Sequence, residues 1–139
     1  THSLSLACAS HPNLKMLACF AEHVSDMIRD GYDVIIVSSG AVSIGCQRLG
    51  LAERPKSVIT KQAVAAAGQG RLMRLYDDLF SIIGQPIAQV LLSRENIAQE
   101  HHYRNALNTF KELMRLRVVP IVNENDTVAV DELRRAMRI

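Results

Sequence analysis

The sequence predicts an α/β fold with a mainly parallel sheet covered by helices on both faces. Three short apolar runs rich in β-branched residues alternate with longer segments whose apolar side chains recur at helical spacing. Helical crossovers of this kind join parallel strands and place helices on both faces of the sheet. At 139 residues the chain has the size of one domain, so we expect residues 1–139 to form a single domain.

The first helix is predicted by apolar residues that recur with a period near 3.6 over residues 14–28. Ser10 or Asn13 can serve as its N-cap, and Gly31 stands where a C-cap glycine is expected. The run of residues 34–37 follows, apolar on both faces as a buried parallel strand should be.

Two further helices are expected before the next strand. One runs from about residue 41 to 49 and ends at Gly50, and Ser57 can cap the other. We expect the glycines of residues 68–70 to interrupt this second helix and to let it pack tightly against a neighbour, although they could also bring backbone close to a ligand. The helical pattern resumes beyond them and stops at Gly84.

The last third of the chain repeats the alternation of strand and helix. We predict a strand over residues 87–92, a short polar helix beginning at Ser93, and a third strand over residues 118–122. Between the last two we predict a second helix, whose apolar side carries residues from Tyr103 to Leu116.

In open parallel sheets a ligand binds beyond the carboxyl ends of the strands. That rule selects the segments 38–40, 92–94 and 123–127. The first places two hydroxyls and a glycine at a helix N-terminus, where unpaired N–H groups favour a carboxylate or phosphate. It lacks the Walker and dinucleotide-binding glycine patterns, and simple helix capping is the alternative.

The segment Asn123–Thr127 carries four amide or carboxyl side chains in succession at the end of the third strand. Asn and Asp also form turns by bonding to their own backbone. A turn needs only one or two such residues, so ligand binding and turn formation both remain open here.

The amino-acid composition argues against a membrane or a nucleic acid as a binding partner. Charged residues make up 22% of the chain, hydrophobic residues 48%, and no apolar run approaches the length of a membrane span, so no membrane partner is expected. Net charge is only +2, with scattered basic residues and few aromatic ones, which speaks against a nucleic-acid partner. Three cysteines without Cys-x-x-Cys spacing predict a reducing, cytoplasmic compartment, and the five histidines show no metal-ligand spacing.

Several motifs, read in order, resemble the glutamate 5-kinases of the amino-acid kinase family. They are Val37-Ser-Ser-Gly-Ala-Val42, Arg48-Leu-Gly-Leu51, Lys61-Gln-Ala-Val-Ala-Ala-Ala-Gly-Gln69, Gln89-Val-Leu-Leu92, Arg104-Asn-Ala-Leu-Asn-Thr109 and Val119-Pro-Ile-Val-Asn-Glu-Asn-Asp-Thr-Val-Ala129. Together they cover about residues 24–132, and the Asn-Glu-Asn-Asp segment is where other members of the family differ most.

The resemblance implies a three-layer α/β fold and the Mg2+-dependent transfer of a phosphoryl group from ATP to L-glutamate, which forms L-glutamyl 5-phosphate for proline biosynthesis. It also implies a cytoplasmic homo-oligomer. By motif, the family's substrate-binding serine falls on Ser39 and its substrate-binding aspartate on Asp126. We add the adjacent positions Gly40 and Asn123 to the expected substrate site.

Other parts of the family pattern have no match in these 139 residues. We expect the domain to be partial, lacking a first strand with a phosphate-binding lysine, a Gly-Asp-Asn-Asp motif after Glu132 and the nucleotide-binding half. We therefore expect the polypeptide alone to bind glutamate poorly and to be inactive. Glutamate-dependent ATP turnover by this polypeptide would contradict that expectation.

Two alternatives stay open. Another amino-acid kinase could act on N-acetylglutamate, aspartate or carbamate, and a substrate panel separates these from glutamate. The chain could also be a non-catalytic regulatory or interaction fragment that pairs with an intact subunit through the apolar helix at residues 72–83. Co-purification with a full-length kinase, without activity alone, would favour that reading.

Overall fold

The computed structural model of the chain describes residues 14–92 and 100–123. These residues form two compact units, one made of residues 14–25 and 40–84 and the other of residues 26–39, 85–92 and 100–123. Each unit is described by itself below. No helix in the described ranges has both the length and the apolar character needed to cross a membrane.

The first unit is helical. It contains most of α1 (Leu14–Arg29), together with α2 (Ala41–Leu49) and α3 (Val58–Ile82). Leu17, Ala21 and Val24 form the buried stripe of α1, at the spacing of three and four residues that one helix face requires. The predicted Gly50 stop is confirmed: Gly50 has a φ of 64°, and the N–H of Leu51 bonds back to the carbonyl of Cys46 at 2.9 Å.

The predicted interruption at residues 68–70 is wrong, because α3 runs without a break from Val58 to Ile82. Its buried stripe continues through Gly68, and the stripe comprises Val64, Ala65, Gly68, Leu72, Tyr76 and Phe80. A glycine inside a helix costs about 1 kcal/mol relative to alanine. Burial of five neighbouring side chains on the same face exceeds that cost, so the helix continues. The helix ends at Ile82, and Gly84, two residues farther on, has the positive φ of 69° expected at the predicted stop.

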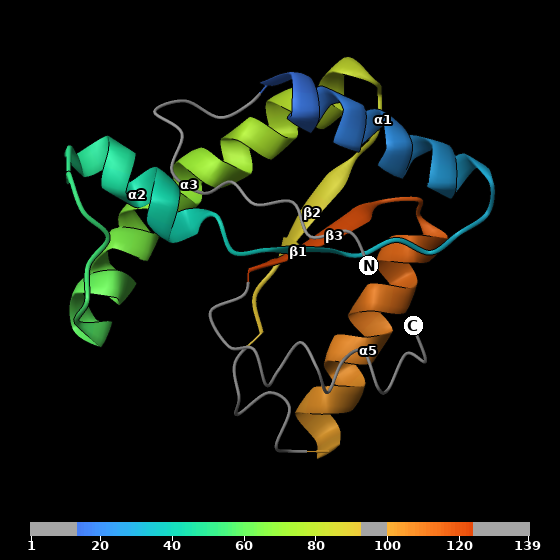
Figure 1. Ribbon diagram of the computed structural model, residues 1–139. Coiled ribbons are helices and arrows are strands. Elements are labelled where there is room, and N and C mark those ends of the chain that lie inside the picture. The colour runs from blue at the N-terminus through green and yellow to red at the C-terminus, as the bar shows by residue number, and fades with distance from the viewer. Residues whose placement is uncertain (1–13, 93–99, 124–139) are drawn as a thin grey trace. The chain divides into compact units, whose positions relative to one another are not determined.

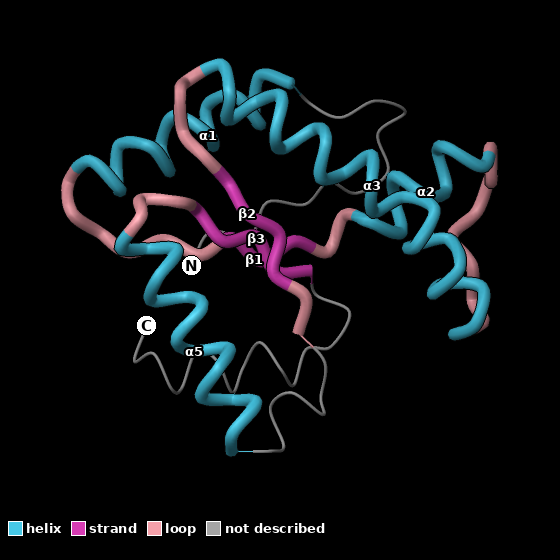
Figure 2. The backbone as a smooth tube through the Cα atoms, turned by 180° about the vertical axis from the view of Figure 1, so that it is seen from behind, coloured by secondary structure: helices cyan, strands magenta, loops and turns pink. Residues whose placement is uncertain are grey.

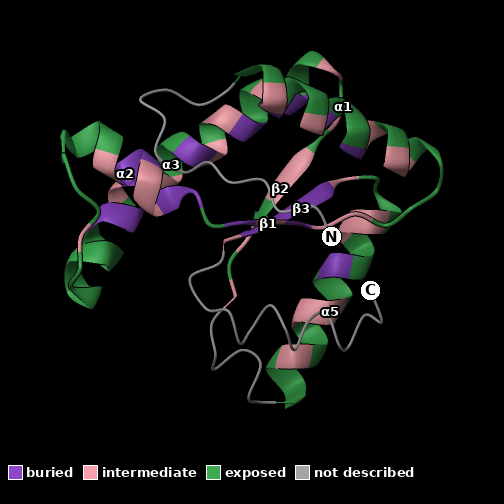
Figure 3. Cartoon of the chain, viewed as in Figure 1, coloured by how far each residue is buried: buried purple, intermediate pink, exposed green. Residues whose placement is uncertain are grey.

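The second unit holds a parallel sheet, as predicted. Its strands are β1 (Ile36–Ser38), β2 (Ile87–Val90) and β3 (Val119–Asn123), and they lie in the order β1-β3-β2 (Figures 1 and 2). Both neighbours of β3 run parallel to it. The central strand is also the most buried one (Figure 3).

The first strand begins two residues later than the sequence predicts, and Pro120 explains the difference. The N–H of Val119 points toward β2, where it bonds to the carbonyl of Pro86 at 3.0 Å. The nitrogen of the next residue, Pro120, therefore faces β1, but proline has no hydrogen to donate there. Pairing with β1 starts only after this gap, at Ile36 opposite Ile121.

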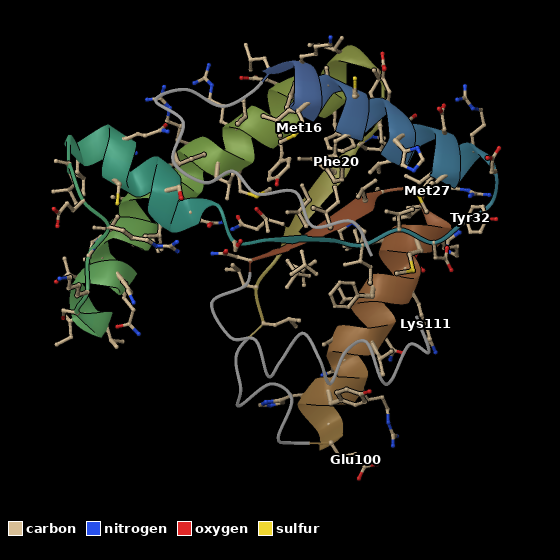
Figure 4. All side chains as sticks on the ribbon, in the orientation of Figure 1. Met16, Phe20, Met27, Tyr32, Glu100 and Lys111 are labelled. Carbon is tan, nitrogen blue, oxygen red and sulfur yellow. The ribbon has the colours of Figure 1, made fainter. Side chains whose placement is uncertain are left out.

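Helix α5 (Glu100–Arg115) packs against one face of the sheet, and Figure 4 labels its first residue, Glu100, and the exposed Lys111 farther along it. Phe110 and Val122 are both fully buried at the centre of this layer. The partly buried residues around them are Ile35, Val37, Val90, Leu92 and Met114. Fully burying one such side chain contributes about 1.5–3 kcal/mol, so this cluster holds helix and sheet together.

Strand two is shorter than predicted and strand three is shifted by one residue. The helix predicted to carry Tyr103 and Phe110 on its apolar side is confirmed as α5. The caps proposed at Ser10 and Asn13 and the short helix proposed at Ser93 lie outside the described residues.

Candidate functional site

The carboxyl ends of β1 and β3 lie beside each other in the second unit. Ser38, the last residue of β1, stands opposite Asn123, the last residue of β3. Neighbouring strands are about 4.8 Å apart, so the two backbones are adjacent at this point. We expected segments 38–40 and 123–127 to lie at the same edge of the sheet. This expectation is confirmed for Ser38 and Asn123, the first residue of each segment.

The side chains of Ser38 and Asn123 share one face of the sheet. Val37, Val90 and Val122 all contribute to the cluster around Phe110 on the α5 side. Because successive side chains in a strand point to opposite faces, Ser38 and Asn123 lie on the face away from α5. This edge thus presents a hydroxyl and a carboxamide side by side.

Ser38 and Ser39 have different surroundings. Ser38 is 4% exposed and is the buried polar residue of the described core, whereas Ser39 is exposed. The Ser-Ser-Gly-Ala motif assigned the substrate-binding role to Ser39. It gave no indication that Ser38 pairs with Asn123 in the sheet. Strand alternation over residues 36–38 is the signal that could have found Ser38, since it places Ser38 on the same face as the buried Ile36.

Gly40 opens the helical unit as the N-cap of α2. The first backbone bond of the helix runs from the N–H of Ile44 to the carbonyl of Gly40 at 3.1 Å. Gly40 has no side chain and makes no side-chain cap, so capping by the N-cap residue does not account for this turn. The N–H groups of residues 41–43 have no acceptor within the helix, which is the arrangement that suits an anion.

The remaining candidates lie outside the described residues. Asp126 and the other members of segment 124–127 belong to this group, as do Ser93 and Arg94. Of the four expected substrate residues, the second unit therefore brings Ser39 and Asn123 to one sheet edge. Gly40 adjoins Ser39 in the chain and belongs to the other unit.

The described residues at the strand ends carry no charge. Ser38, Ser39 and Asn123 are neutral hydrogen-bonding groups. No group of three or more His, Cys, Asp or Glu side chains in the described ranges is arranged to hold a metal ion. The arrangement can therefore orient a polar ligand through hydrogen bonds, and any charge it needs must come from other residues.

A lowered carboxyl pKa belongs to an exposed pair on α5. Arg115 donates bonds of 2.9 and 2.7 Å to the two carboxylate oxygens of Glu112. These bonds lower the pKa of Glu112. The pair lies in the last turn of α5, so it belongs to the helix end and not to the strand-end cluster.

Almost the whole chain is similar in sequence to known proteins. The model of the amino acid kinase family matches residues 4–139. A protein of Acaryochloris marina named glutamate 5-kinase is 59% identical over 135 residues, which are 97% of this chain and 36% of that relative. Relatives of the same name from Trichormus variabilis and Synechococcus elongatus are 61% and 58% identical over 87% and 94% of this chain.

The chain spans about a third of the length of these curated relatives. The family match, by contrast, extends over nearly all of its residues. The parallel strands with their polar carboxyl edge agree with that match in fold. The chain belongs to the amino acid kinase family.

Proposed function

We propose that this chain carries the glutamate-binding segment of a kinase that transfers the γ-phosphoryl group of ATP to the side-chain carboxylate of L-glutamate. The product is L-glutamyl 5-phosphate, the first intermediate of proline biosynthesis. The names of the three relatives support this substrate and this reaction.

The observation that carries the proposal is the register of Ser38 with Asn123. It brings the residue that follows Ser38, the exposed Ser39, to the end of the strand next to Asn123. These segments are far apart in sequence, and both end at the sheet edge where α/β proteins bind ligands. The two segments also resemble the glutamate-binding motifs of glutamate 5-kinases, and this resemblance supports the proposal.

Glutamate offers this edge two carboxylates and an ammonium group. In the proposed site, the hydroxyl of Ser39 and the N–H groups that follow Gly40 donate to one carboxylate. Asn123 contributes a carboxamide that can donate or accept. Asp126 accepts from the ammonium group, which is the strongest single interaction this set can make with an amino acid.

Phosphoryl transfer needs a well-placed acceptor more than it needs covalent help from the protein. An oxygen of the glutamate carboxylate attacks the γ-phosphorus, the bond from that phosphorus to the bridging oxygen breaks, and ADP leaves. Holding the acceptor carboxylate in line is the contribution we assign to Ser39, Gly40, Asn123 and Asp126.

The described residues do not themselves supply a set of ligands for Mg2+. The strand ends present neutral groups, and no acidic cluster for a metal lies in the described ranges. Use of ATP and Mg2+ is therefore proposed from the kinase family alone, as are the homo-oligomeric state and the cytoplasmic location.

A segment exchange tests the proposal. The 135 matched residues of the Acaryochloris marina relative are replaced by those of this chain, and ADP release is measured with and without L-glutamate. We expect glutamate-dependent turnover, with L-glutamyl 5-phosphate trapped as a hydroxamate by hydroxylamine. The unmodified relative is the positive control.

A substrate panel completes the experiment. N-acetylglutamate, aspartate and carbamate are supplied in place of glutamate. An acetylated amine cannot offer an ammonium group to Asp126, so activity should fall sharply with N-acetylglutamate. A folded exchange enzyme that prefers any of these three compounds, or that lacks turnover with glutamate, would overturn the proposed substrate.

A further inference from the structure

Helices α2 and α3 of the first unit approach each other more closely than side chains would allow. A Cβ atom built on Gly68 of α3 would lie 2.1 Å from the carbonyl oxygen of Ala41 and 2.5 Å from the backbone nitrogen of Gly45, both in α2. One built on Gly45 would lie 1.9 Å from the carbonyl oxygen of Val64. The contact on both sides is backbone, so no flexible side chain can move aside.

A third contact joins the two helices near the other end of α2. The guanidinium of Arg48 donates a bond of 3.0 Å from Nη1 to the carbonyl oxygen of Ala67. Ala41, Gly45 and Arg48 are spaced by four and three residues, so they lie on one face of α2. This seam, made of Ala41, Gly45 and Arg48 with Val64, Ala67 and Gly68, fixes α2 along α3.

The seam begins at the end of α2 to which the proposed function assigns a role. Ala41 is the first residue of α2 and directly follows Gly40. We propose that Gly68 is a positioning residue: by lacking a side chain it sets where the first turn of α2, which follows Gly40, lies along α3, and thereby how tightly the N–H groups of that turn hold the glutamate carboxylate. This inference rests on the proposed function.

The size of the expected displacement follows from the contact. Ordinary van der Waals contact of a Cβ begins at 3.4 Å, and the available distance is 2.1 Å, so the helices must separate locally by about 1.3 Å. The short α2 is the element that yields, since α3 is anchored by its long buried stripe. A displacement of about 1 Å in a positioning element can cost up to about 100-fold in rate or affinity.

Gly68→Ala in the exchange enzyme tests the inference, with Gly70→Ala as the matched control. Gly70 lies two residues away in the same helix, and a Cβ there meets nothing within 4 Å. We expect Gly68→Ala to raise the KM for glutamate about tenfold or more while the KM for ATP changes less than about twofold. Gly70→Ala should leave both KM values unchanged and raise thermal stability slightly.

The two KM values distinguish positioning from folding. A purely structural role would lower the amount of active enzyme and hence the apparent kcat, with both KM values unchanged, and that result would overturn the inference. If the unmodified exchange enzyme shows no turnover with glutamate, the proposed function fails and the inference falls with it. If that enzyme is active and Gly68→Ala keeps its glutamate KM, only the inference fails.

A second variant decides the question if Gly68→Ala does not fold. Arg48→Met keeps the apolar stem of the exposed arginine and removes the donor to Ala67, and Arg71→Met, on the exposed side of α3, is its control. We then expect about a twofold or larger rise in glutamate KM for Arg48→Met alone, because α2 loses one of its contacts with α3 and its first turn is held less firmly. An unchanged glutamate KM would overturn the inference.

Discussion

The guanidinium of Arg117 donates a hydrogen bond of 3.0 Å from Nη1 to the carbonyl oxygen of Ile28, 89 residues earlier in the chain. The same carbonyl accepts the N–H of Gly31 in the turn that ends α1. The carbonyl of Arg117 in turn accepts a bond of 2.8 Å from Nε2 of Gln85, just before β2. Arg117 thus joins the ends of two helices and the approach to a strand within the second unit.

Arg117 also occupies a backbone conformation that usually selects glycine. Its φ is 58°, and its N–H and that of Val118 bond back to the carbonyls of Met114 and Leu113, both at 2.9 Å. This is the arrangement of a glycine-ended helix terminus. An L side chain in the left-handed region costs about 1 kcal/mol, so the guanidinium contact offsets a local strain.

Two substitutions separate the strain from the contact. Arg117→Ala loses the bond to Ile28 and keeps the strain, whereas Arg117→Gly loses the same bond and relieves the strain. We expect the glycine variant to be more stable than the alanine variant by about 1 kcal/mol, measured by urea unfolding of the chain. An alanine variant at least as stable as the glycine variant would contradict this account.

Ser38 and Ser39 should respond differently to alanine. Ser39 is exposed, so in the exchange enzyme Ser39→Ala should raise glutamate KM about tenfold or more, the cost of losing a hydrogen bond to a charged group, and leave thermal stability nearly unchanged. Ser38 is buried and has a polar partner, so Ser38→Ala should lower stability by about 1 kcal/mol. The reverse pattern would assign the ligand contact to Ser38.

Asp126→Ala should raise the glutamate KM of the exchange enzyme far more than its ATP KM, because the lost carboxylate is the proposed partner of the substrate ammonium. Glutarate, which has no ammonium group, provides the control as a competitive inhibitor. Its inhibition constant should be nearly the same with and without the substitution. Equal increases in both KM values would remove Asp126 from the list of substrate ligands.

Phe110→Ala should destabilise the second unit by about 3–5 kcal/mol, the usual cost of emptying a fully buried aromatic site. That is a large part of the total stability of a domain, about 5–15 kcal/mol. Lys111→Ala, at the exposed neighbouring position, should change stability by no more than about 0.5 kcal/mol. If thermal unfolding shows similar losses of stability for the two variants, burial of Phe110 does not stabilise the packing of α5.

The predicted elements depended on local signals, and they were correct where those signals decide the outcome. Gly31, Gly50 and Gly84 all have the positive φ that ends a helix, and the three apolar runs form parallel strands. The predicted break at Gly68 was wrong, whereas the tight packing predicted for the same glycines is confirmed at Gly68. Local sequence does not specify the side chains elsewhere in the fold whose burial keeps the helix continuous. The start of β1 depended on Pro120, 84 residues away from Ile36 in the chain.

For the candidate site, the sequence alone determined which segments carry the polar groups, since residue type and strand order are local properties. Tertiary structure decided which of those residues are neighbours. Pairing in register set Ser38 opposite Asn123, and the alternation of side chains left Ser38 buried and Ser39 exposed. Strand register and close contacts between helices depend on how segments that are distant in the chain pack against each other. The free energy of that packing depends on both segments, so the sequence of one segment alone does not determine it.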